Sequence, residues 1–214
     1  MPAQMTMNRL IHAAVRRDLD RLATALGSLS DGDRARAQDL ERAYANLRRE
    51  LTHHHESEDR WIWPMLAEKG ADPALLAAME SEHHAMSAAL AETGAALTVV
   101  AGTGSATDAE SAGASVVRTR EVVEQHLTHE EQDLEPVLVP HVESPEWKRV
   151  EKKLRSQPPR TAGRFFAWLT DGMGHEQRAD LRATVPAPVV LVLGKVFGRS
   201  YHREIAPVWQ SGRN

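Results

Sequence analysis

Cysteine is absent from this 214-residue sequence. Its absence excludes disulfide bonds, thiolate nucleophiles and thiolate metal ligands, and it fits the reducing conditions of a cytoplasmic protein, which is the location we expect. No apolar run approaches the ~20 residues of a membrane span, and the first residues lack the apolar segment of a signal peptide. The net charge of −4 gives no basic surplus. We therefore expect neither a nucleic-acid nor a membrane partner.

Histidine, by contrast, is abundant. The chain has 11 histidines, and most of them lie between His12 and His129. The hydrophobic content of 42% and the charged content of 26% are typical of a globular protein. The length is sufficient for one sizeable core with an appendage.

One spacing pattern occurs twice. His54 is followed after four residues by Glu58 and after ten by Pro64, and the same frame returns 72 residues later with His126, Glu130 and Pro136. At this composition such a frame is expected ~0.05 times by chance, so two copies are improbable at about one in a thousand. The repeat is the strongest signal in the sequence.

The chemistry of the repeat points to metal. On a helix, residues four apart share a face, so an imidazole and a carboxylate at this spacing converge on one ion, and the carboxylate reaches a second. Two such pairs on facing helices provide the ligands of a dimetal carboxylate site in a bundle. Imidazole and carboxylate together suit iron or manganese and tolerate zinc. The alternative is that each pair is an ordinary solvated helix surface.

Apolar periodicity predicts four long helices, over residues 7–29, 34–63, 73–100 and 115–139. Each carries a histidine within its apolar stripe: His12, His54, His83 and His126. Glu58 and Glu130 occupy stripe positions as well. Burying a carboxylate costs free energy unless the carboxylate is paired or binds metal. These positions therefore favour a buried metal site over a solvated helix surface.

Other polar residues near the stripes are not expected to be the main metal ligands. His84 and His129 border the stripes and are kept as reserve ligands. His53 and His55 are turned about 100° from His54, so we expect them to flank the site or to support its ligands from outside. The acidic neighbours expected at the surface or as outer partners are Glu56, Asp59 and Glu82.

The predicted fold is all-α: an antiparallel up-down four-helix bundle over residues 5–140, with a C-terminal helical extension over residues 141–214. Small and polar residues predict a flexible loop over 101–113. Residues 188–197 are ambiguous between helix and strand, and we favour helix. We expect the extension to pack on the bundle or close one end, with dimerisation as the other option.

The H…HxxxE…H…HxxxE pattern resembles the hemerythrin-like family, the HHE cation-binding domains, over about residues 5–140, and within it a bacterial subgroup. The resemblance implies a four-helix bundle around a non-haem diiron centre with an oxo or hydroxo bridge. It also implies bridging roles for the two glutamates and the ligand set His12, His54, Glu58, His83, His126 and Glu130.

The sequence departs from the oxygen-carrying members of that family at two positions. Carriers have a second histidine where this chain has Ser87, and an aspartate where it has Glu131. The place of the missing histidine falls to His84, to His129 or to solvent. Reversible oxygen carriage is therefore not the expected function.

Three functions follow from these observations. The first is a diiron redox protein that reacts with dioxygen, peroxide or nitric oxide, with catalase-like peroxide disproportionation as its most testable form. The second is a sensor or store of oxygen, nitric oxide or iron without turnover. The third is a structural metal site that only holds the bundle together. The sequence does not specify the oligomeric state.

Overall fold

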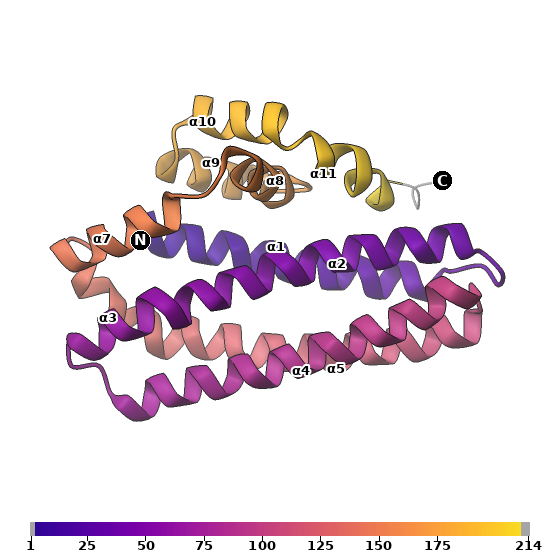
Figure 1. Ribbon diagram of the computed structural model, residues 1–214, viewed down its shortest axis with the longest axis horizontal. Coiled ribbons are helices and arrows are strands. Elements are labelled where there is room, and N and C mark those ends of the chain that lie inside the picture. Colours follow the sequence, from indigo (N-terminus) through magenta and orange to yellow (C-terminus); the bar gives the residue numbers. More distant parts are fainter. Residues whose placement is uncertain (1–2, 211–214) are drawn as a thin grey trace.

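The computed structural model describes residues 3–210, and the side chains of residues 6–210. Every regular element in that range is a helix (Figure 1), which confirms the all-α prediction; residues 211–214 of the predicted extension lie outside it. The long helices are α1 Ala3–Gly27, α2 Arg34–Ser57, α4 Pro73–Thr103 and α5 Ala106–His129.

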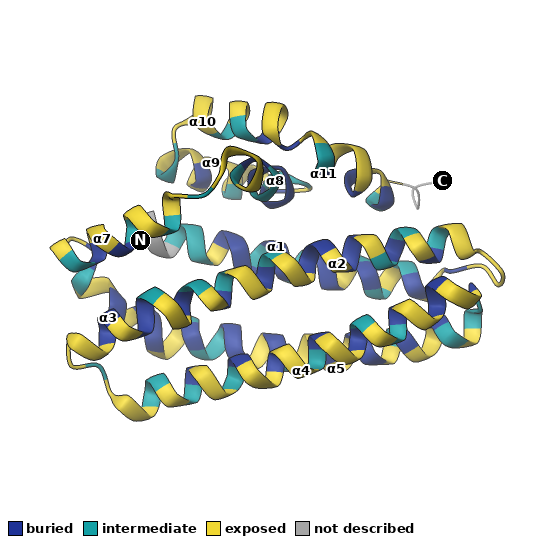
Figure 2. Ribbon diagram, in the orientation of Figure 1, coloured by how far each residue is buried: buried dark blue, intermediate teal, exposed yellow. Residues whose placement is uncertain are grey.

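The four long helices form an up-down bundle in which each packs against two others. Helix α1 contacts α2 and α5, and α4 contacts the same two. Their apolar stripes face inward as predicted, with Leu19, Leu40 and Leu97 fully buried (Figure 2). Among the described residues only α4 is long and apolar enough, by length and composition, to cross a membrane, and here it packs within the bundle.

Two of the bundle helices widen into a π-helical turn at the repeated frame. Helix α2 continues through η1 Glu58–Ile62 into α3 Trp63–Glu68, and α5 continues through η2 Glu130–Leu134 into α6 Glu135–Leu138 and η3 Val139–His141. Pro64 and Pro136 stand in the first turn of α3 and α6, where an amide hydrogen is not needed. The chain therefore stays helical past both prolines.

The predicted flexible loop over residues 101–113 is wrong. Helix α4 runs to Thr103, a single turn at Gly104 and Ser105 follows, and α5 begins at Ala106. The small residues that suggested a loop allow close helix packing instead, because Ala109 and Ala112 are buried. Gly104 has φ +68, and an added Cβ there would lie 2.8 Å from the backbone nitrogen of Arg34, so this turn requires glycine.

The C-terminal extension is helical too. Its elements are α7 Pro145–Arg155, α8 Pro159–Thr170, α9 His175–Thr184, α10 Ala187–Val192, η4 Leu193–Phe197, α11 Arg199–Glu204 and η5 Ala206–Trp209. Residues 188–197, ambiguous in the sequence, are thus helical. Helices α8 and α9 contact α1, and η5 contacts α2, so most of the extension lies along the side of the bundle (Figure 1).

A buried aspartate anchors the extension. Asp18 of α1 is 1% exposed and accepts a 2.8 Å hydrogen bond from the indole nitrogen of Trp168 in α8. Arg17 donates to the same carboxylate at 2.8 Å and, at 3.2 Å, to the backbone carbonyl of Trp168. The extension is therefore attached to the helix that also carries His12.

Candidate metal centre

Each long helix places a histidine on the axis of the bundle. His12 and His126 are fully buried, His83 is 5% exposed, and the side chain of His54 is 11% exposed. The two frame glutamates are also buried, at 2% for Glu58 and 3% for Glu130. All six predicted ligands are thus brought into one polar cluster inside an apolar core.

The Nε2 atoms of the four histidines point at one another in two pairs. The Nε2 atoms of His12 and His54 are 3.4 Å apart, and those of His83 and His126 are 3.2 Å apart. Two ring nitrogens this close need either a proton on one of them or a cation between their lone pairs. Each pair is therefore placed so that it could bind a cation.

The glutamates link the two pairs. Glu58 has Oε1 at 3.2 Å from His54 Nε2 and Oε2 at 3.6 Å from His83 Nε2, so its two oxygens face different pairs. Glu130 has Oε2 at 3.2 Å from His12 Nε2 and at 3.8 Å from His126 Nε2. Its Oε1 accepts a 2.9 Å hydrogen bond from the side-chain amide of Asn8. Both carboxylates therefore span the space between the two pairs.

The outward nitrogens of three histidines bind carboxylates. The Nδ1 atoms lie at 2.8 Å from Glu131 for His12, at 2.8 Å from Asp59 for His83 and at 2.9 Å from Glu82 for His126. An acid on Nδ1 holds the proton there and leaves the Nε2 lone pair free to face the interior, which is the usual arrangement around metal-binding histidines. Glu131 therefore orients His12 and lies outside the central cluster.

The reserve histidines do not enter the cluster. His84 is exposed. His129 is partly exposed and its Nδ1 lies 2.8 Å from the second oxygen of Glu82, so it shares the acid that holds His126. His53, expected to flank the site, is exposed as well.

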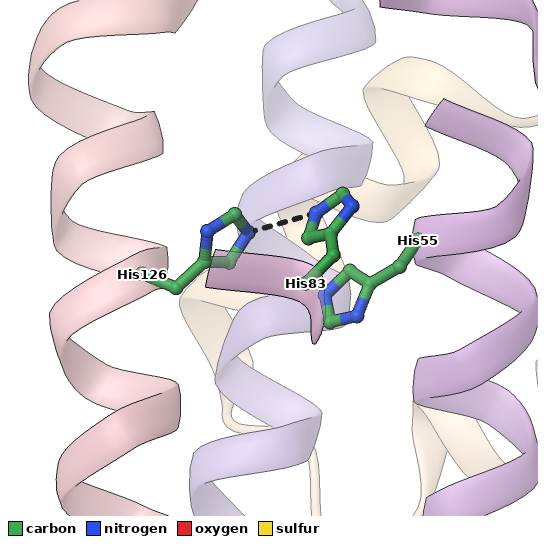
Figure 3. Close-up of side chains that lie close together, drawn as sticks. All are labelled: His55, His83 and His126. Atoms are coloured by element: carbon green, nitrogen blue, oxygen red, sulfur yellow. Dashed lines mark hydrogen bonds between the residues drawn. The ribbon is translucent and has the colours of Figure 1, made fainter. Parts of the chain in front are cut away.

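His55, the other histidine expected to flank the site, lies buried directly against it. It is 6% exposed, and its ring stacks on that of His83 with centroids 4.3 Å apart and lies 5.3 Å from the ring of His126 (Figure 3). The signal that could have found it is the width of a buried stripe, which spans at least about 100° of a helix and so admits two adjacent residues.

Charge is distributed unevenly over the cluster. Burial lowers the pKa of His12, but the carboxylates of Glu130 and Glu131 outweigh burial and raise it to about 9. Burial lowers the pKa of His54 to about 3. Burial raises the pKa of Glu130, but the charge of His12 outweighs burial, so the pKa of Glu130 is lowered. The pKa of Glu58 is raised by burial and by the negative charge of Glu130.

Three buried atoms of the cluster make no hydrogen bond of good geometry: Oε2 of Glu58, Oε2 of Glu130 and Nε2 of His55. Of these, Oε2 of Glu130 lies within ion-pair distance of His12. A buried polar atom without a hydrogen bond costs free energy. The carboxylate oxygens are electron-pair donors, and so is Nε2 of His55 in the tautomer that carries its proton on Nδ1, so cations would satisfy all three. Ligand atoms within 4.8 Å of one another form the sets His12, His54 and Glu130; His55, His83 and His126; and His54, His55 and Glu58. The residues present therefore fit a metal centre.

Fold and site together define the chain as a four-helix bundle with a buried histidine and carboxylate metal site. The family model described as "Hemerythrin HHE cation binding domain" matches residues 8–138, so the chain belongs to the hemerythrin family, as the resemblance indicated. No curated protein and no solved structure matches the chain.

Proposed function

We propose that the protein holds two iron ions and that these ions bind or react with a small oxidant such as dioxygen, peroxide or nitric oxide. In this proposal His12, His54 and Glu130 hold one ion, His83 and His126 hold the other, and Glu58 spans the two. The observation that carries it is the set of buried carboxylate oxygens, without a hydrogen bond of good geometry, between two pairs of inward-facing imidazoles.

Membership of a cation-binding family supports a bound metal. The donor atoms are all nitrogen or oxygen, which suits iron. Iron supplies one-electron redox chemistry and a coordination position for a small ligand. The chain contributes the surroundings: apolar residues exclude bulk water, and the outer carboxylates keep protons on Nδ1 of three histidines. Asn8 holds Glu130 in place through Oε1.

Elemental analysis of the purified protein, paired with its absorption spectrum before and after peroxide, tests the proposal. Two irons per chain and a peroxide-dependent spectrum would support it, and evolution of dioxygen and water from peroxide, above the rate of free iron, would identify turnover. A colourless protein that holds zinc or a single ion would overturn it in favour of a structural site.

A sensor without turnover is the second candidate, and one observation favours it. Through Arg17, Asp18 and Arg21 the extension is attached to α1, the helix that also supplies His12. A change in the position of α1 on ligand binding would therefore reach the extension. Hydrogen exchange over residues 145–210 should then differ between oxidised, reduced and ligand-treated protein, whereas identical exchange would exclude the relay.

A further inference from the structure

His55 lies beside the pair formed by His83 and His126, on a different helix from either. Figure 3 shows the three rings grouped between α2, α4 and α5. The ring of His55 is stacked on His83 with an interplanar angle of 18° and stands edge-on to His126 at 82°. One nitrogen from each of the three lies within 4.8 Å of the other two.

Packing alone does not account for a histidine at this position. Its Nε2 is buried and has no hydrogen-bond partner, and burying an imidazole nitrogen without a partner costs free energy that an apolar ring of similar size would not. Among the described residues no ion pair joins His55 to a carboxylate, whereas His12, His83 and His126 each have one on their outward nitrogen. The neighbours of His55 belong to the proposed metal ligands: the rings of His83 and His126, and His54 and Glu58, which each have a donor atom within 4.8 Å of one of its nitrogens.

We propose that His55 is the third imidazole ligand of the ion held by His83 and His126. This inference rests on the proposed two-ion function and adds a ligand to it. The two ions then have unequal surroundings, with three imidazoles on one ion and two, from His12 and His54, on the other.

The test is His55→Phe in the full-length chain, loaded anaerobically with ferrous iron. Phenylalanine keeps a flat ring for stacking on His83 but supplies no nitrogen. We expect one of the two ions to bind more than about 100-fold more weakly in competition with a chelator, beyond the loss typical of an outer partner, while the other ion is retained. The matched control is His53→Phe, at the exposed neighbouring position, which should keep both ions at wild-type affinity.

X-ray absorption of the wild-type protein gives a second readout that needs no variant. The imidazole scattering should correspond to five rings bound to the two ions together. Scattering from only four rings would overturn the proposal. Unchanged affinity for both ions in His55→Phe would overturn it as well. If the wild-type chain itself binds fewer than two ions, the proposed function fails instead, so the two failures are distinguishable.

Discussion

At the scale of single residues, the centre depends on acids that never face the cluster. Asp59, Glu82 and Glu131 each hold the outward nitrogen of a histidine, from 2.8 to 2.9 Å. Each acid comes from a helix other than that of its histidine. The outer shell therefore fixes ring orientation and also ties neighbouring helices together around the site.

Replacing Glu82 by glutamine should weaken metal binding without unfolding the bundle. Glu82 accepts from both His126 and His129, and an amide lacks the negative charge that makes His126 a stronger donor. Outer-partner changes of this kind cost about 10–100-fold in metal affinity, measurable by chelator competition. Glu80→Gln, two residues away and exposed, is the control; equal losses in both variants would show that Glu82 has no special role.

Metal loading should release protons near neutral pH. In the metal-free cluster His12 has a pKa of about 9, so its ring is protonated at pH 7.5, whereas a metal ligand must be neutral. We expect at least about one proton released per chain at pH 7.5, and the part that comes from His12 should fall as the pH rises through about 9. A pH-stat during iron addition measures it, and release that does not depend on pH would contradict the assignment of His12.

At the scale of elements, the features that could be predicted from the sequence were those that follow from its periodicity. The stripes located all four long helices, and the repeated frame located both glutamates in one cluster. The burial of His55 was not predictable in this way because a helix in a bundle faces two neighbours: His54 turns toward His12 of α1, and His55 toward His83 of α4. One sequence-derived stripe cannot separate these two directions.

The π-helical turns were not predictable from periodicity either. Both begin at the frame glutamate, Glu58 or Glu130, and both precede a proline. Such turns are uncommon and occur frequently at functional sites. Their coincidence with the repeated frame explains why Pro64 and Pro136 recur at fixed spacing: each proline begins a new α-helical turn directly after the widened one.

Within the extension, the crossing of α8 and η4 requires a glycine. An added Cβ on Gly163 would lie 2.6 Å from the carbonyl carbon of Phe197 and 2.7 Å from the backbone oxygen of Leu193. Since backbone atoms cannot turn aside as a side chain does, Gly163→Ala should lower the free energy of unfolding by about 1–3 kcal/mol.

The control for this substitution is Gly113→Ala in α5, where nothing lies within 4 Å of the added Cβ. It should raise the free energy of unfolding by about 0.5–1 kcal/mol, because alanine is the better helix former. Urea denaturation measures both variants. A neutral Gly163→Ala would mean that the two helices separate at no cost.

At the scale of the whole molecule, charge divides the chain unevenly. Residues 1–140 have 13 basic and 23 acidic side chains, a net charge of −10, and residues 141–214 have 13 and 7, a net charge of +6. The total of −4 conceals this division. The contacts between bundle and extension do not simply follow these net charges: Arg21 of the acidic bundle binds Asp171 of the basic extension at 3.0 Å.

Asp18 is the residue on which this attachment depends most. It is almost fully buried and accepts from Trp168, Arg17 and Arg21. Asp18→Ala leaves the indole N–H of Trp168 without its partner and Arg17 without its carboxylate, whereas Arg21 keeps its ion pair with Asp171. Removing one partner of a buried ionic network costs about 3–5 kcal/mol, and we expect the lower end because Arg17 and Arg21 are partly exposed.

The matched control is Asp20→Ala, two residues along the same helix. Asp20 pairs with Arg120 at 3.1 Å, but both side chains are more than half exposed, so its loss should cost about 0–1 kcal/mol. In Asp18→Ala we expect proteolysis within residues 145–210 at urea concentrations where the bundle stays helical and keeps its metal. If the two variants unfold alike, or if metal is lost together with the extension, then extension and bundle form a single cooperative unit and α1 does not act as a separable link between them.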